Sequence, residues 1–135
     1  MEIIRGHKIS SGTAEGSVLI SHDPLSFFGG VNPETGVVIE KGHEIEGVSI
    51  KDKVLVFPHG KGSTVGSYAL YRMKKEGVSP KAIVNVECEP IVAVGAIISN
   101  IPAIHRLEQN PLNLLRNGMK VRVDADHATL EVLDC

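Results

Sequence analysis

The segment KVLVFPHGKGSTVGSYALYRMKK, residues 53–75, carries the clearest local pattern in the chain. It opens with KVLVF (53–57), an apolar run that ends at a proline and predicts a buried strand. A glycine-rich turn follows, and apolar residues then recur every four positions, which predicts a helix over about 64–75. Ser63 can cap this helix by accepting a free N–H, and Gly77 is placed to end it.

Short apolar runs divided by glycine and proline predict many short strands and a few helices elsewhere. Further strands are expected at 3–9, 17–21, 37–39, 81–86, 103–105, 119–124 and 129–133. Pro90 can open a second short helix through about Ile98, whose all-round apolar character implies burial. Residues 111–116 form one or two helical turns. This order predicts one mixed α/β domain over residues 1–135, with three β/β/α layers, a partly barrel-like β core and helices covering one side.

The charge balance argues against a nucleic-acid or membrane partner. The formal net charge is −2, and lysine and arginine form no stripe that could displace counterions from a polyanion. The longest apolar stretch, residues 91–98, is too short to span a bilayer, and the N-terminus shows no signal peptide. We therefore expect a cytoplasmic protein.

Metal-ligating residues are too few for a metal centre built by this chain alone. Cys88 and Cys135 are its two cysteines, whereas the usual iron–sulfur cluster needs three or four. No two of the six histidines lie at i and i+4. We predict no metal site and no cofactor bound by this chain, with Cys88 as a buried thiol and Cys135 as a terminal one.

The turn GKGSTVGS, residues 60–67, is the first candidate for chemistry. Its glycines let the backbone approach a ligand, the helix start presents unpaired N–H groups, and Lys61 adds a positive charge. These features favour an anion such as a carboxylate, a phosphate or an alkoxide. A purely structural junction that needs glycine for its geometry and serine for capping fits the same residues. A P-loop does not fit, because Lys61 precedes Gly62 and position 56 is valine.

The long loop over residues 22–36 is the second candidate, since loops of this length are often functional. It contains Phe27 and Phe28, which we expect to plug the core as a pair. The backbone of Gly29 and Gly30 is the part that we expect to serve a ligand. His59, beside the first candidate turn, is expected to face solvent.

Five motifs, taken in order, resemble the small subunit of the aconitase X family. They cover essentially the whole chain: GTAEGSVLIS, PLSFFGGVNPETG, FPHGKGSTVGSYALY, VGAIISNIPAI and DADHATLEVL. One departure is Asn32, where we expect aspartate in the family pattern. The resemblance implies the swivelling β/β/α domain of the aconitase superfamily.

The resemblance also implies a hydro-lyase that works only as a heterodimer with a large subunit carrying an iron–sulfur cluster. In the two-subunit type, the reaction is dehydration of (R)-5-phosphomevalonate to trans-anhydromevalonate 5-phosphate in isoprenoid synthesis. The cluster iron acts as a Lewis acid on the hydroxyl, and Ser63 accepts the proton next to the carboxylate. The residues implied to bind substrate are Lys61, Gly62, Thr64, Gly29 and Gly30.

Two alternatives remain open from the sequence. The first is a dehydratase subunit for another hydroxy acid, such as cis-3-hydroxyproline. The second is a non-catalytic phosphate carrier or binding module, in which His59 would be the key residue. The usual Thr-Ser-His motif of such carriers is missing here.

Overall fold

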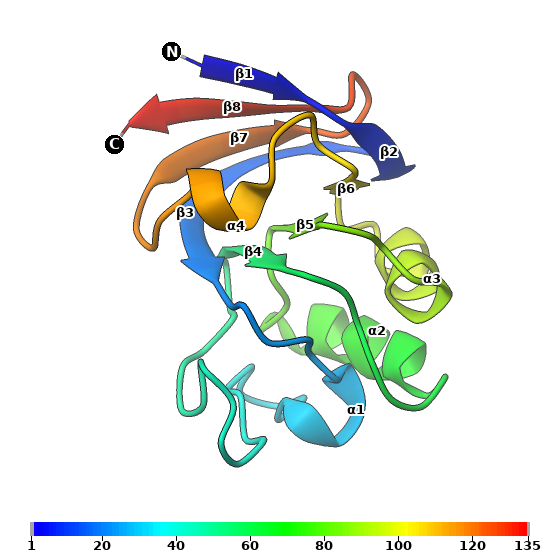
Figure 1. Ribbon diagram of the computed structural model, residues 1–135. Helices are drawn as coiled ribbons and strands as arrows, with labels where there is room; N and C mark the ends of the chain where they lie inside the picture. Colours follow the sequence, from blue (N-terminus) through cyan, green and yellow to red (C-terminus); the bar gives the residue numbers. More distant parts are fainter. Residues whose placement is uncertain (1, 135) are drawn as a thin grey trace.

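The computed structural model describes residues 2–134, and its strands follow one continuous order, β1-β8-β7-β3-β4-β5-β6-β2 (Figure 1). The strand bounds are β1 Glu2–Arg5, β2 His7–Ser10, β3 Thr13–Ile20, β4 Val54–Phe57, β5 Ala82–Asn85, β6 Ala103–His105, β7 Lys120–Asp124 and β8 Thr129–Asp134.

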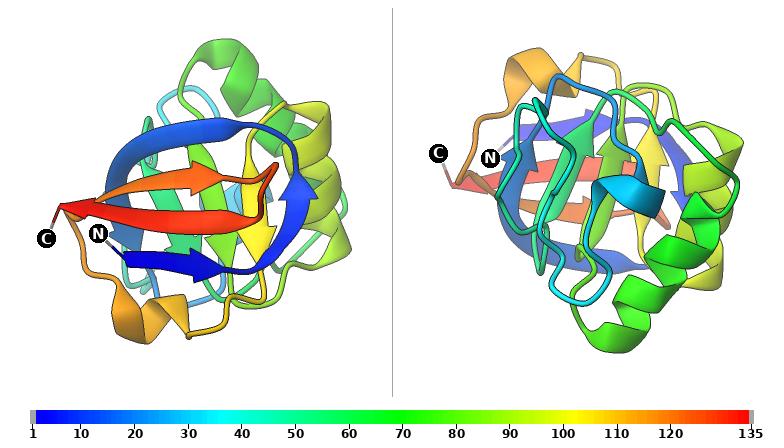
Figure 2. Two further views of the ribbon diagram at one scale, coloured as in Figure 1. Left: turned by 90° about the horizontal axis from the view of Figure 1, so that it is seen from above. Right: turned by 90° about the horizontal axis from the view of Figure 1, so that it is seen from below.

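The longest strand, β3, divides the sheet into two halves. Its first part pairs antiparallel with β7, which continues through β8 to β1, whereas its last part pairs parallel with β4. β5 and β6 continue the parallel half, and β2 closes it as an antiparallel edge. β1 and β2 occupy opposite ends of the strand order but are joined through Gly6 alone, so the sheet curls round until its ends meet (Figure 2, left). The expected partly barrel-like β core is confirmed.

The parallel strands separate two hydrophobic cores, because their side chains alternate between the two faces of the sheet. Val54 and Val56 of β4 fill the core between the two halves of the sheet. Leu55 and Phe57 fill the core between the parallel half and the helices. β3 and β5 alternate in the same way, and this arrangement produces the three predicted layers.

Two longer helices cover the parallel half, α2 (Gly66–Glu76) and α3 (Pro90–Ile98), while α1 (Phe27–Gly30) and α4 (Pro111–Leu114) are single turns (Figure 2, right). None of the helices within residues 2–134 is long and apolar enough to cross a membrane.

The predicted end of α2 is confirmed, but its predicted start is two residues early. Gly77 ends the helix with a φ of +77° and donates its N–H to the carbonyls of Met73 and Lys74. At the other end, the N–H groups of Gly66 and Ser67 donate to the carbonyls of Ser63 and Thr64. Residues 63–65 therefore form turns that lead into the helix.

Glycine allows α2 and α3 to approach closely. A Cβ at Gly66 would lie 3.1 Å from Ile91 Cγ2, and a Cβ at Gly95 would lie 3.1 Å from Leu70 Cδ2. Across this contact the Ser67 hydroxyl donates to the Ile91 carbonyl at 2.7 Å. The starts of the two helices are thus held side by side.

The predicted burial of the second helix is wrong for one of its faces. Val92 and Ala96 lie in the core, but Val94, Ile97 and Ile98 are 48%, 54% and 39% exposed. An all-apolar helix has no polar side to mark which face meets solvent, so the sequence could not identify this face.

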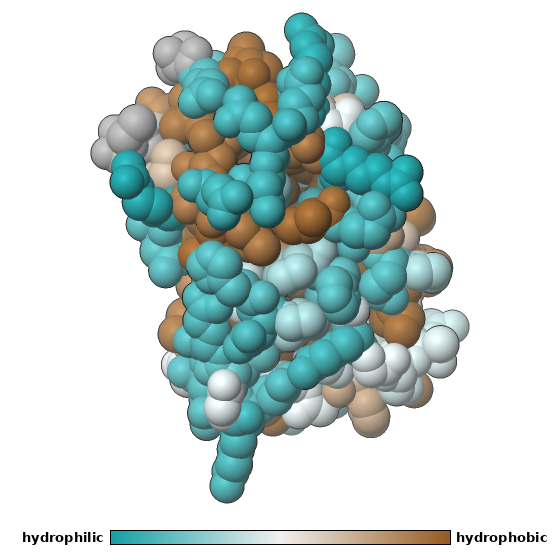
Figure 3. Space-filling view, in the orientation of Figure 1, coloured by the Kyte–Doolittle hydropathy of each residue, from teal (hydrophilic) through white to brown (hydrophobic). Residues whose placement is uncertain are grey.

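The segment between α1 and β4 has little regular structure. The strand expected at 37–39 is wrong: Val37 and Val38 make only isolated bridges, to Ser49 and Val31. On the face drawn in Figure 3, hydrophilic side chains gather over this segment. Its position relative to the sheet is set by contacts described below.

We predict that Leu55→Ala destabilises the fold by about 2–5 kcal/mol, because it removes a fully buried side chain and leaves a cavity. Ile3→Ala is the matched control, since Ile3 on β1 is 57% exposed and its truncation should change stability by less than about 0.5 kcal/mol. Urea unfolding of both variants measures the difference. Equal effects would contradict the assignment of Leu55 to the core.

Candidate functional site

The candidate site lies beyond the carboxyl ends of the parallel strands β3 and β4, where ligands of α/β sheets commonly bind. The chain segments that leave these two strands stay paired. Leu25 donates its N–H to the His59 carbonyl at 3.3 Å and accepts from the Lys61 N–H at 3.2 Å. The two sequence-predicted candidates, residues 22–36 and 60–67, therefore lie side by side.

Ser63 is exposed on the turn before α2. Its Oγ accepts the N–H of Val65 at 3.1 Å, and its carbonyl accepts the N–H of Gly66 at 2.9 Å. The structure places Val65 at the N-cap position, so the expectation that Ser63 caps the helix by accepting an N–H of its first turn is wrong. The side chain instead closes a tight turn over two residues.

Unpaired N–H groups follow one another in the turn that precedes the helix. Within residues 2–134, the N–H groups of Gly62, Ser63 and Thr64 donate to no protein acceptor, whereas those of Val65 and Gly66 are paired. Successive free N–H groups of this kind favour a bound anion. The unpaired N–H groups that the sequence places at the helix start lie in the turn before it, at residues 62–64.

Lys61 is paired with a carboxylate that the sequence gave no reason to expect. Its Nζ lies 2.7 Å from Glu40 Oε2, and both side chains are partly exposed. The backbone of Glu40 is fixed as well, because its N–H donates to the Gly30 carbonyl. Lys61 and Glu40 lie 21 residues apart in the sequence. No periodicity of a helix or strand would predict a contact between them.

Gly62 and Gly30 both lie against Ser26. Gly62 has a φ of +95°, and a Cβ added to it would lie 2.8 Å from Ser26 Oγ. A Cβ at Gly30 would lie 3.4 Å from Ser26 Cβ, whereas one at Gly29 would meet nothing within 4 Å. The structure thus brings Gly30 to the same place as Lys61 and Gly62, and leaves Gly29 open.

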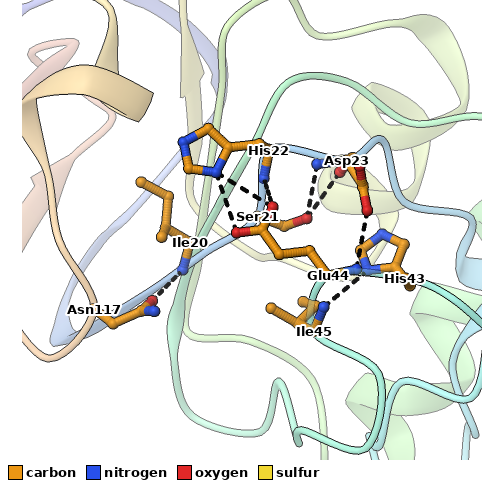
Figure 4. Close-up of polar contacts among 8 residues, drawn as sticks. All are labelled: Ile20, Ser21, His22, Asp23, His43, Glu44, Ile45 and Asn117. Carbon is orange, nitrogen blue, oxygen red and sulfur yellow. Dashed lines mark hydrogen bonds and ion pairs between the residues drawn. The ribbon is translucent and has the colours of Figure 1, made fainter.

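A polar cluster fastens the Glu40 segment to the end of β3 (Figure 4). His22 contacts Glu44 through both its N–H, at 2.6 Å, and its ring Nδ1, at 3.1 Å, and the Glu44 N–H donates to Asp23 at 2.9 Å. His43 is buried, with its Nε2 2.9 Å from the Pro24 carbonyl. These contacts explain how an irregular segment holds Glu40 beside the turn.

The expectation that Phe27 and Phe28 plug the core as a pair is half wrong. Phe27 is 2% exposed and packs edge-on against Phe57, with ring centroids 5.9 Å apart. Phe28 is 55% exposed. The backbone leaves the helical region at Phe28, which has a ψ of 115°.

Asn32 and His59 have local structural contacts. The Asn32 Oδ1 accepts the N–H of Glu34 at 2.9 Å, which forms a turn that asparagine and aspartate both favour. His59 is exposed, as expected, with its Nδ1 2.7 Å from the Gly60 carbonyl.

No group of three or more histidine, cysteine, aspartate or glutamate side chains gathers to hold a metal ion in the described part of the chain. Burial, followed by the charges of Glu89 and Glu87, raises the pKa of the Cys88 thiol to about 12. A protonated thiol is a poor nucleophile, so Cys88 is predicted to be unreactive at neutral pH. Cys135, the expected terminal thiol, lies outside the described residues.

We predict that at pH 8 Cys88 reacts with a soluble alkylating reagent at least about a hundredfold more slowly than an unperturbed cysteine with a pKa near 8.5. The raised pKa keeps the thiol protonated until the pH approaches 12. Peptide mapping by mass spectrometry follows Cys88 separately from Cys135, and urea-unfolded protein is the control. Equal rates in the folded and unfolded protein would contradict the raised pKa.

The comparisons with known proteins agree over nearly the full length. The phosphomevalonate dehydratase small subunit of Methanococcoides burtonii is 56% identical over 126 residues, covering 93% of this chain and 92% of the relative. The one from Methanosarcina mazei is 57% identical over 129 residues, covering 96% and 90%. The crystal structure of Thermococcus kodakaraensis aconitase X in its holo form superposes with a TM-score of 0.94 at 52% identity, covering 99% of this chain and 100% of that one.

The fold and the sequence comparison point to the same protein family. The layered sheet with its curled antiparallel half and helix-covered parallel half matches the aconitase X structure along the whole described chain. The model of the aconitase X swivel domain matches residues 3–132. This chain therefore belongs to the aconitase X swivel-domain family.

Proposed function

We propose that this chain is the small subunit of a phosphomevalonate dehydratase, a hydro-lyase that converts (R)-5-phosphomevalonate to trans-anhydromevalonate 5-phosphate. The observation that carries this proposal is the 50–57% identity, over nearly the whole chain, to relatives of that name. The activity then requires a large subunit, since the relatives are named as small subunits.

The described residues of this chain do not fit an iron–sulfur cluster. They contain no group of three metal-binding side chains, and Cys88 is the one cysteine among them. In this proposal the cluster that the family implies therefore belongs to the large subunit. This chain contributes the proton acceptor and part of the substrate site.

Ser63 is the proposed proton acceptor. Its oxygen takes the proton from the carbon next to the carboxylate, the electrons of that C–H bond form the double bond, and the hydroxyl leaves with its C–O electrons. A serine can act as a base only where its alkoxide is stabilised. The Val65 N–H already donates to Ser63 Oγ at 3.1 Å, and a hydrogen bond to the charged form lowers its free energy.

The residues around Ser63 are proposed to bind the anionic substrate. The free N–H groups of Gly62, Ser63 and Thr64 suit a carboxylate or phosphate oxygen. Lys61 would contribute a charge that Glu40 holds in place. The backbone around Gly29 and Gly30 would border the same site, because Gly30 and Gly62 both contact Ser26.

We predict that Ser63→Ala, assembled anaerobically with the large subunit, lowers kcat for phosphomevalonate dehydration by about 10²–10⁴-fold, as expected for loss of a general base. Affinity for the large subunit should stay unchanged, because the hydroxyl contacts only its own turn. Product formation is followed by mass spectrometry. Ser11→Ala is the control, since Ser11 is an exposed serine outside the site. Full activity of Ser63→Ala would refute the proposed role.

We predict that Gly62→Ala lowers kcat at least about tenfold, whereas Gly118→Ala leaves it unchanged. Both glycines have a positive φ, +95° and +88°, so both variants should lose about 1–2 kcal/mol of stability. Only at Gly62 would the added Cβ meet a neighbour, Ser26 Oγ at 2.8 Å, and so displace the turn. Thermal unfolding and the dehydration assay separate the two effects. Equal activity of both variants would show that the turn tolerates the shift.

A further inference from the structure

Three of the five phenylalanine and tyrosine side chains in this aromatic-poor chain are exposed, and two of them, Phe28 and Tyr68, line the same hollow. The chain has three phenylalanines, two tyrosines and no tryptophan. Phe27 and Phe57 are buried, whereas Phe28, Tyr68 and Tyr71 are 55%, 69% and 38% exposed. Neighbouring exposed aromatic side chains are typical of surfaces that bind another protein.

Two apolar hollows lie on either side of Tyr68. One has a volume of about 310 Å³, and its lining includes Phe28, Val31, Ile39, Val65, Tyr68 and Ala69. The other has a volume of about 250 Å³ and is lined by Thr64, Ser67, Tyr68, Pro90, Ile91 and Val94. Tyr68 is the ridge between them, so the two hollows form one continuous surface.

This surface continues along α3. Val94 lines the second hollow, and Ile97 and Ile98 follow it at the spacing that places side chains on one helical face. Each of these three residues exposes more than a third of its surface to solvent. We call the exposed side chains of Phe28, Ile39, Val65, Tyr68, Val94, Ile97 and Ile98 the apolar face.

The apolar face begins at the proposed proton acceptor. Val65 lines the first hollow and Thr64 lines the second, and both directly follow Ser63 in the chain. A partner that encloses Ser63 can therefore contact this surface at the same time. Its edge is polar: Arg72 pairs with Glu34 at 3.2 Å, and Lys61 pairs with Glu40 at 2.7 Å. An apolar centre with a polar rim is the usual composition of a protein–protein interface.

We propose that the large catalytic subunit docks on the apolar face, with apolar side chains filling the two hollows beside Tyr68. This proposal rests on the proposed function, which supplies the partner and the need to enclose Ser63. Docking here excludes water from the turn at residues 62–64 and strengthens its hydrogen bonds to an anion.

The test uses the two subunits of the complete enzyme and charged substitutions chosen to keep the small subunit folded. Tyr68→Asp places an acid in the first turn of α2, and Ile97→Lys places a base in the last turn of α3, so both charges suit the helix dipole. Ile3→Lys, on exposed β1, is the matched control. Circular dichroism establishes that each variant is folded, and calorimetric titration measures its Kd for the large subunit.

We expect Tyr68→Asp and Ile97→Lys each to raise that Kd by at least about tenfold, and Ile3→Lys to leave it unchanged. Folded variants that bind as tightly as the parent chain would overturn the proposal. It would also be overturned if the variants changed only the self-association of the small subunit, since the face would then join two copies of this chain.

The proposed function is judged separately in the same experiment. If the unsubstituted subunits bind but do not dehydrate phosphomevalonate, the substrate is wrong, and the comparison of Kd values still decides the interface. If the unsubstituted subunits do not bind at all, the subunit assignment and the interface both fail.

Discussion

The parallel register of β4 between β3 and β5 is the constraint on which the rest of the structure depends. All four residues of β4 are buried, with Val54 and Val56 in one core and Leu55 and Phe57 in the other. A shift of one residue would exchange the two sets of side chains. Phe57 also contacts Phe27 edge-on, which places α1 beside the turn that leaves β4. The layers and the position of the candidate site therefore follow from the pairing of one short strand.

Local sequence patterns are sufficient to predict those helices and strands whose signals lie within a few residues. Apolar runs indicate β4 and β5. Gly77 indicates the end of α2, because the residue after a helix commonly needs a positive φ and glycine adopts one readily. The start of α2 was misplaced, since several turn conformations can precede a helix and the serine could cap any of them. The exposure of Phe28 and of one face of α3 could not be predicted. It depends on which neighbours the fold supplies, and a uniformly apolar sequence does not encode that.

The candidate site likewise combines residues that are neighbours in the sequence with residues that only the fold brings together. Gly60, Gly62 and Ser63 adjoin one another, so their turn could be identified from the sequence alone. Glu40 and Ser26 could not, because they reach the turn through backbone pairing of Leu25 and through the polar cluster around His22 and Glu44. An irregular loop carries no periodicity that would indicate those contacts.

Val65 links the proposed chemistry to the proposed interface within a single residue. Its N–H donates to Ser63 Oγ, and its side chain, 43% exposed, lines the apolar hollow beside Tyr68. A partner that fills the hollow would therefore contact the residue whose N–H stabilises the proposed alkoxide. The opposite face of α2 packs in the core through Leu70 and Met73, so the helix is held on the side away from the hollow. If both proposals hold, docking of the large subunit and stabilisation of the Ser63 alkoxide would involve the same residue, Val65.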